Sequence, residues 1–268
     1  GVPCYSYPGE AARALVALTR YQKVRSRELG RPVTFDDADR AKAEEILQGA
    51  TEAGHKLLPA VEVYGVLAAY GIVTAGWRVV DNAGQAEQAA EEIGYPVVVK
   101  ADSESIVHKS DLGGVAMDLK DSSALRAAIK EMKGRLGTKG MRFLVQEYLP
   151  GGMEIIIGAK AEEELGHLIM FGLGGIYVEV LEDVVFKLSP VTTVEAQDMI
   201  VSIKAASLLD GVRGQEGIDK EGIVEVILRL SQLVTEQPVI QEIDLNPIVA
   251  YHDRIYAVDA RISVDSNQ

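Results

Sequence analysis

The sequence is poor in the residues that mark an extracellular scaffold or a membrane protein. Its 268 residues include one cysteine, Cys4, so neither an intramolecular disulfide nor a cysteine metal cluster can form. No apolar run approaches the ~18 residues of a membrane span, and the N-terminus has no basic segment followed by an apolar one. These absences predict no membrane association, no secretory leader and a cytoplasmic protein.

Positive charge is also scarce. The chain has 27 lysines and arginines against 40 aspartates and glutamates, which gives a formal net charge of −13 and an isoelectric point near 4.8. A protein that follows nucleic-acid phosphates needs an excess of basic residues, so no nucleic-acid partner is expected. An anionic ligand must instead be neutralised by a few cations placed at its site.

The order of expected helices and strands predicts an α+β fold with two units. In the first, helices (59–70, 83–93, 122–136) alternate with strands (77–80, 96–100, 114–119, 142–148). After Pro150-Gly151-Gly152 the second has five strands (154–159, 167–171, 183–188, 239–245, 255–258) and two helices (194–209, 220–235). We expect four parts: a segment with one helix at 1–29, a helical linker at 30–56, and units at 57–149 and 150–268.

Two polar features at strand ends are candidates for ligand binding. Lys100 ends an apolar strand, which places its ammonium group at the rim of a sheet. On this pattern alone a solvated lysine is the commoner outcome. The second feature lies at the junction of the two units, where ligands often bind. Its residues are Gln146, Glu147, Tyr148 and Leu149.

A glycine-rich stretch, Gly172-Leu173-Gly174-Gly175, lies between two expected strands. The backbone N–H groups of Gly174 and Gly175 could approach a phosphate closely, although a plain turn is the commoner role. Charged residues follow at Glu179, Asp183 and Lys187. The chain contains no GxxxxGK(S/T) motif, which excludes a P-loop.

Three oxygen-bearing residues, Glu242, Asp244 and Asn246, alternate along one expected strand and so project from one face of the sheet. Asp259 lies on the strand expected to pair with it. Carboxylate and amide oxygens are hard ligands that suit a magnesium ion also bound by substrate phosphates. A solvated polar face is the alternative interpretation.

His108 lies in the polar turn His108-Lys109-Ser110-Asp111-Leu112-Gly113-Gly114, between two apolar runs. A neutral imidazole nitrogen accepts a phosphoryl group readily at neutral pH, so His108 is a candidate phosphoryl acceptor. Considered alone, a structural loop histidine is the commoner role. The other histidines, expected to be solvated, are His55, His167 and His252.

Taken together, these pieces resemble the ATP-grasp domain of the NDP-forming acyl-CoA synthetase family, which includes ADP-forming acetate–CoA ligase and is related to succinyl-CoA synthetase. The matching segments cover much of the chain from residue 57 to residue 264, in order. They are residues 96–115, 145–158, 171–191, 208–214, 242–250 and 257–262.

The resemblance implies an ATP-grasp fold in which two α+β subdomains hold ATP or ADP with Mg²⁺ between them. Lys100 would contact the phosphates, Gln146 to Leu149 would form the adenine hinge with Glu147 reading the base, and Glu154 would lie near the ribose or phosphates. The glycine pair Gly174-Gly175 and Arg213 would complete the nucleotide site. Lys187 stands where arginine is expected, which keeps the charge but loses the planar fork.

The resemblance also assigns the metal and the reaction. Asn246 and Asp259 would be the principal magnesium ligands, with Asp244 beside them. His108 would be the second phosphohistidine of a relay that interconverts acyl-CoA, ADP and phosphate with carboxylate, CoA and ATP. Because the helix in residues 1–29 looks like the end of a preceding CoA-ligase portion, the CoA-binding domain or subunit with the first phosphohistidine is expected as a partner outside this chain.

Two alternatives remain open at the level of sequence. One is a nucleotide-binding regulatory module of a larger protein, such as an acetyltransferase fusion, in which no phosphate moves. The other is a direct ATP-dependent carboxylate ligase without a histidine intermediate. The sequence leaves open the acyl substrate, the choice between ATP and GTP, fusion to the CoA-binding part, and homo-oligomerisation.

Overall fold

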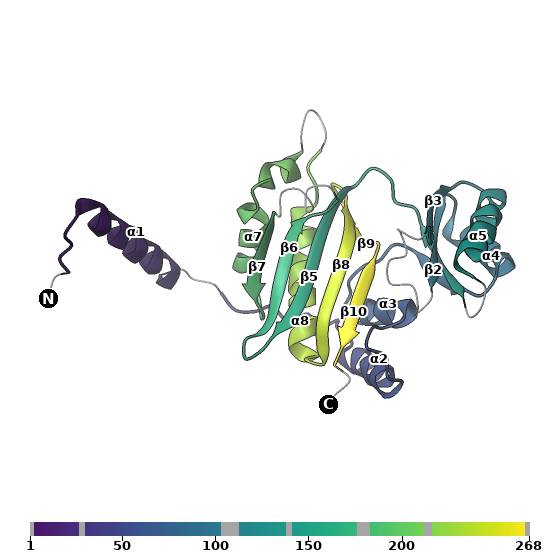
Figure 1. The fold of residues 1–268 in the computed structure, drawn as a ribbon, viewed down its shortest axis with the longest axis horizontal. Coiled ribbons are helices and arrows are strands. Elements are labelled where there is room, and N and C mark those ends of the chain that lie inside the picture. Colours follow the sequence, from purple (N-terminus) through teal and green to yellow (C-terminus); the bar gives the residue numbers. More distant parts are fainter. Residues whose placement is uncertain are drawn as a thin grey trace.

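A computed structural model describes residues 3–26, 30–102, 113–137, 141–175, 183–211 and 216–265. Two antiparallel sheets lie side by side, each covered by helices, and helix α1 (Pro8–Arg25) projects away from both (Figure 1). The α+β class is confirmed. No helix in the described residues is long and apolar enough to cross a bilayer.

The smaller sheet has the strand order β1-β4-β2-β3. Its strands are β1 (Trp77–Val80), β2 (Val97–Asp102), β3 (Val115–Leu119) and β4 (Arg142–Glu147). Helices α4 (Ala83–Ile93) and α5 (Ser122–Leu136) pack on it. All six residues of β2 are buried, because this strand is internal to the sheet. This explains the unbroken apolar run before Lys100.

The caps expected for the helices of the smaller unit are present. The side chain of Asn82 accepts a hydrogen bond from the backbone N–H of Gln85 at the start of α4. Asp121 does the same for Ala124 at the start of α5, with a distance of 2.9 Å. Each cap gives a partner to a backbone N–H that has none within the helix, and this fixes the residue at which the helix begins. Both helices therefore begin where the sequence predicts.

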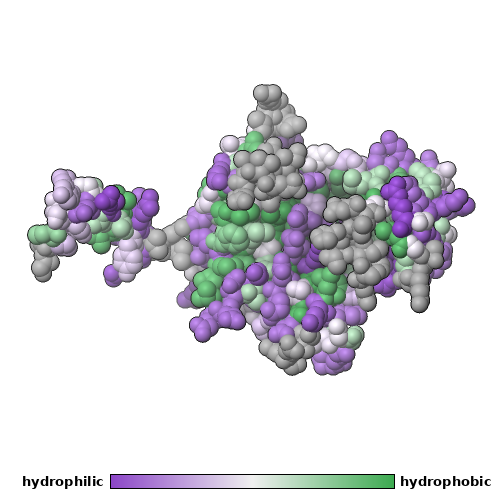
Figure 2. Space-filling model, in the orientation of Figure 1, coloured by the Kyte–Doolittle hydropathy of each residue, from purple (hydrophilic) through white to green (hydrophobic). Residues whose placement is uncertain are grey.

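The larger sheet has the order β10-β8-β5-β6-β7, with β9 paired to β8. Its strands are β5 (Met153–Glu162), β6 (Gly166–Leu173), β7 (Val184–Leu188), β8 (Ile240–Ala250), β9 (Ile255–Ala257) and β10 (Ala260–Val264). Helices α7 (Thr193–Ser202) and α8 (Lys220–Glu236) pack against β5, β6 and β7. Figure 2 shows apolar residues gathered on the face of this sheet away from α7 and α8. On β7, Phe186 and Leu188 are 53% and 47% exposed, whereas Val185 packs against the core.

Helices α2 (Arg40–Glu52) and α3 (Ala60–Ala69) also belong to the core of the larger sheet. The sequence divides them between a linker at 30–56 and the unit at 57–149, whereas their packing joins them to the second unit. In α2 the buried residues Ala43, Leu47 and Ala50 recur three to four positions apart. These residues form one narrow apolar stripe on the helix. The stripe is hard to recognise in the sequence because the segment is rich in alanine and charged residues.

Two expectations about the larger unit are wrong. The helix expected at 194–209 is divided into α7 and a 3₁₀ helix, η1 (Ala206–Asp210). The division occurs because the carboxylate of Asp183 accepts hydrogen bonds from the backbone N–H groups of Lys204 and Ala205, which lie between the two helices.

His167 is not solvated. It is 5% exposed, and its Nε2 lies 2.7 Å from the carbonyl oxygen of Ile240.

Candidate functional site

A cavity of 1470 Å³ lies between the two sheets. Strands β2, β3 and β4 form one wall, and residues of β5, β8 and β10 form the other. The turn before α3 and the start of that helix close a third side. Several charged side chains line the cavity, including Lys100, Asp102, Arg142, Glu147, Glu154, Asp259 and Arg261.

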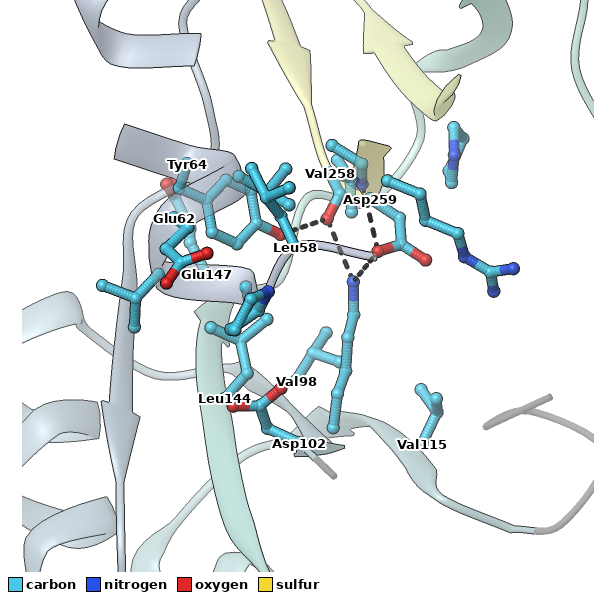
Figure 3. Close-up of a pocket in the computed structure, with 18 of the residues that line it drawn as sticks. Leu58, Glu62, Tyr64, Val98, Asp102, Val115, Leu144, Glu147, Val258 and Asp259 are labelled. Carbon is cyan, nitrogen blue, oxygen red and sulfur yellow. Dashed lines mark hydrogen bonds and ion pairs between the residues drawn. The ribbon is translucent and has the colours of Figure 1, made fainter. Parts of the chain in front are cut away.

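Lys100 reaches across this cavity from the smaller sheet. Its Nζ donates a hydrogen bond of 3.0 Å to the carbonyl oxygen of Val258 and lies 3.9 Å from Oδ1 of Asp259 (Figure 3). The side chain of Lys100 is 11% exposed, whereas that of Asp259 is 42% exposed. The lysine is therefore held in a defined position rather than extended into solvent, and the interpretation of Lys100 as a solvated strand end is wrong.

The expected hinge follows β4 along the edge of the cavity. Glu147, Tyr148 and Leu149 all line the cavity. The backbone N–H of Glu147 donates to the carbonyl of Gly76 at 2.8 Å, and its Oε2 accepts from the N–H of Gly76 at 3.3 Å. This double contact fixes the end of β4 against the start of β1.

Gln146 differs from its neighbours in the hinge. Its side chain is 0% exposed and does not line the cavity. Instead its Nε2 donates to the hydroxyl oxygen of Tyr64 at 3.3 Å. A side chain in this position supports the wall of the cavity and does not face a ligand within it.

The glycine stretch lies against Glu154. The N–H of Gly174 donates to the carbonyl of Glu154 at 2.8 Å, and a Cβ at Gly174 would lie 3.0 Å from the backbone carbon of Glu154. Gly175 has φ +61°, and a Cβ there would lie 3.1 Å from Oε2 of Glu154. Glycine suits both positions, the first because a Cβ would crowd Glu154 and the second because its φ is positive.

The three proposed metal ligands lie where β8 and β10 join, and Asp259 lines the cavity whereas Asp244 and Asn246 do not. Asp244 lies opposite Arg261 in the register, and the N–H of Asn246 donates to the carbonyl of Asp259 at 3.0 Å. Burial raises the pKa of Asp244, and the carboxylates of Glu242 and Asp259 raise it further, while Arg261 opposes them. A carboxylate in such surroundings gains from a nearby cation.

The donor set fits a magnesium ion that shares its coordination with phosphate. Within the described part of the chain no three histidine, cysteine, aspartate or glutamate side chains form a metal cluster. Two carboxylates and one amide are hard oxygen ligands, and Mg²⁺ is usually held by one or two carboxylates together with phosphates. Asp244, Asn246 and Asp259 match this pattern rather than that of a metal cage formed by protein alone.

Some expected residues fall elsewhere. His108, Arg213 and Glu179 lie outside the described residues. Lys187 lies on β7 opposite Ile169 and does not line the cavity.

The structure also brings in residues that sequence reasoning missed. Asp102 and Arg142 face each other at the ends of β2 and β4 and form an ion pair of 3.0 Å. Their opposite charges at two strand ends were the available signal. Tyr64 lies on the apolar helix α3, where nothing in the sequence distinguishes it from a core residue.

Comparison with known proteins identifies the family. The model of an ATP-grasp domain matches residues 49–264. The chain is 40% identical over 227 residues to the beta subunit of ADP-forming acetate–CoA ligase I of Pyrococcus furiosus, covering 83% of this chain and 97% of that subunit. It is also 38% identical over 266 residues to acetate–CoA ligase I (ADP-forming) of Archaeoglobus fulgidus, covering 98% of this chain but only 39% of that protein.

Solved structures give the same result. Acetyl-coenzyme A synthetase 1 of Candidatus Korarchaeum cryptofilum, solved with coenzyme A and Ca-AMPCP, matches with a TM-score of 0.79 and 38% identity, covering 83% of this chain and 100% of that chain. Another complex of this enzyme, with coenzyme A and Mg-AMPPCP, has its phosphohistidine segment pointing towards the nucleotide binding site; it matches with a TM-score of 0.75 and 38% identity, again covering 83% of this chain and 100% of that chain. The chain therefore belongs to the ATP-grasp family, as the ATP-grasp part found in ADP-forming acid–CoA ligases.

Proposed function

We propose that this chain transfers a phosphoryl group between ATP or ADP and His108, as the nucleotide-side half of an ADP-forming acid–CoA ligase. The observation that carries the proposal is the approach of Lys100 and Asp259 across one cavity, with the hinge residues and Glu154 in its walls. A phosphate-binding cation and a metal-binding carboxylate at this spacing suit a nucleotide that lies between the two sheets.

Different residues would bind the phosphates, the base and the metal ion of the nucleotide. Lys100 would neutralise phosphate charge, and Glu147 to Leu149 would contact the base. Asp244, Asn246 and Asp259 would hold Mg²⁺, which when bound supplies further neutralisation of charge on the transferring group. Because the N–H of Gly174 is bonded to the carbonyl of Glu154, Gly175 would be the glycine that lets a backbone N–H approach the phosphates. Phosphoryl transfer depends mainly on such positioning and charge compensation.

A CoA-binding domain or subunit would complete the reaction. The chain spans 39% of the Archaeoglobus ligase and 97% of the separate Pyrococcus beta subunit. Both fused and separate arrangements therefore exist among its relatives. In the complete enzyme, phosphate carried by His108 would pass to or from that partner, where acyl-CoA and carboxylate interconvert.

Labelling with radioactive ATP tests the proposal. The chain is incubated with γ-labelled ATP and Mg²⁺, and the phosphoprotein is tested for stability in acid and in base. We expect a label that is lost in acid, retained in base, and absent from His108→Ala. Equal labelling of His108→Ala would contradict the role of His108, and nucleotide binding without any label would show a binding module instead.

A further inference from the structure

A chain of hydrogen bonds links the hinge strand β4 to Lys100. Nε2 of Gln146 donates to the hydroxyl oxygen of Tyr64 at 3.3 Å, and this hydroxyl donates to the carbonyl oxygen of Val258 at 3.2 Å. The same carbonyl accepts the hydrogen bond from Lys100 at 3.0 Å (Figure 3). One backbone carbonyl is therefore shared by the tyrosine of α3 and the lysine of β2.

The ring of Tyr64 is held firmly. Tyr64 is 3% exposed, and its ring stacks on that of Trp77 with centroids 4.9 Å apart and planes inclined by 27°. Trp77 lies on β1 opposite Gln146 in the register of the smaller sheet. Burial raises the pKa of the Tyr64 hydroxyl, with a smaller contribution from Asp259, so the group remains a hydrogen-bond donor throughout the physiological range.

The shared carbonyl has a special place in the chain. It belongs to Val258, the residue immediately before the proposed magnesium ligand Asp259. A carbonyl oxygen has two lone pairs, and here Tyr64 and Lys100 both donate to it. The orientation of this peptide therefore sets the position of the Lys100 Nζ and the direction in which the Asp259 side chain points from the backbone.

We propose that Tyr64 is a positioning residue that, through the carbonyl of Val258, places Lys100 for the phosphates of the nucleotide. This inference rests on the proposed function. It goes beyond that function in assigning a role in phosphate binding to a tyrosine that need not touch the ligand, and in connecting the base-binding strand to the phosphate-binding lysine through Gln146.

The test is the affinity for Mg-ADP and for adenosine, measured by titration calorimetry on the full chain. Tyr64→Phe keeps the ring that stacks on Trp77 and removes only the hydroxyl. Because loss of one hydrogen bond corresponds to about threefold to tenfold in an equilibrium constant, we expect Mg-ADP to bind about threefold to tenfold more weakly. Adenosine has no phosphate and should bind within about twofold of the wild type. Equal weakening of both ligands would show a merely structural role and overturn the proposal.

A double-mutant cycle tests whether Tyr64 acts through the lysine. In a Lys100→Met background, adding Tyr64→Phe should change the affinity for Mg-ADP by less than about twofold, since the group that Tyr64 positions is absent. A loss as large as in the wild-type background would overturn the proposal. Gln146→Leu leaves the hydrogen bond from Tyr64 to Val258 in place, so it should lower the affinity for Mg-ADP less than Tyr64→Phe does. A greater loss of affinity would assign the positioning role to the Gln146 side-chain amide instead.

A matched control comes from the end of the same helix. The hydroxyl of Tyr70 donates a hydrogen bond of 2.8 Å to Oε2 of Glu236. Tyr70 is 0% exposed and does not line the cavity. Tyr70→Phe should therefore leave the affinity for Mg-ADP unchanged, and an equal loss in both variants would contradict a specific role of Tyr64. If the wild-type chain binds no Mg-ADP, the proposed function itself fails; if it binds and the effect of Tyr64→Phe does not depend on phosphate, only the role of Tyr64 fails.

Discussion

Lys100 Nζ lies 3.9 Å from Oδ1 of Asp259. The two residues are far apart in the sequence: Val258, just before this aspartate, lies 158 positions after Lys100. The lysine comes from the smaller sheet, and the aspartate follows β9 of the larger one. This ion pair bridges the two units at the point where the proposed function places a phosphate and a magnesium ion. Its partial burial makes it stronger than an exposed pair, while leaving the carboxylate accessible from the cavity.

Removal of the ammonium group should weaken nucleotide binding strongly. We expect Lys100→Met to lower the affinity for Mg-ATP about 10-fold to 100-fold, because hydrogen bonds to charged groups contribute about 1.5–3 kcal/mol. Titration calorimetry measures the effect. Lys130→Met is the control, since Lys130 is exposed on α5 away from the cavity. Comparable losses in the two variants would mean that overall charge, and not the position of Lys100, sets the affinity.

A methyl group at Gly174 should disturb the contact with Glu154. In Gly174→Ala the new Cβ would lie 3.0 Å from the backbone carbon and from Cβ of Glu154, so the two segments must move apart. We expect a loss of about 1–3 kcal/mol in the free energy of unfolding, the usual cost of overpacking, together with weaker nucleotide binding.

Gly134→Ala is the matched control for this substitution. Gly134 lies inside α5, and a Cβ there meets nothing within 4 Å. Alanine is a better helix former than glycine, so this variant should be as stable as the wild type or up to about 1 kcal/mol more stable. Urea unfolding followed by circular dichroism measures both. A Gly174→Ala variant as stable as Gly134→Ala would show that the loop adjusts freely.

Sequence predicted most of the scaffold because its elements are short and locally specified. Helices α4 and α5 begin at side-chain caps, and Gly94 and Gly137 follow their last residues with φ values of 98° and 89°. Such signals lie within a few residues of one another. The hinge, the glycine stretch and the oxygen-ligand strand became candidates for the nucleotide site in the same way, because each forms a contiguous motif.

Contacts between distant segments could not be predicted. The position of Gln146 behind the cavity wall depends on Tyr64, 82 positions earlier in the chain. The break after α7 depends on Asp183, which the sequence shows only as a polar residue near a strand. A periodicity describes one element, whereas these side chains are placed by the packing of several elements together.

The ion pair between Asp37 and Arg229 should make stability depend on pH. The hydrogen bond from Arg229 lowers the pKa of Asp37 below its usual value of 3.8. Since the folded-state pKa is lowered, the stabilising contribution is present above 3.8 and is lost as the pH falls through the lower folded-state value. Asp37→Asn should therefore be less stable than the wild type at pH 7.

The decisive measurement is the difference in urea midpoint between Asp37→Asn and the wild type as a function of pH. The difference should shrink as the pH falls below 3.8, where the wild-type carboxylate becomes protonated. Asp36→Asn is the control, because Asp36 is a neighbouring acidic residue for which no contact with Arg229 is found. A difference that stays constant down to pH 3 would assign the effect to packing rather than to charge.

Removal of residues 1–29 should leave the rest of the fold intact. Of the described residues, none from α1 belongs to either hydrophobic core, and Leu15, Leu18 and Tyr21 are 64%, 58% and 64% exposed. A segment without buried contacts adds little to stability, so the chain beginning at Gly30 should unfold within about 2 °C of the full chain and bind Mg-ADP equally well. Differential scanning calorimetry and titration of both chains make the comparison. A fall of more than about 5 °C would show that α1 contacts the two sheets in solution, and would place the boundary of the folded unit before residue 30.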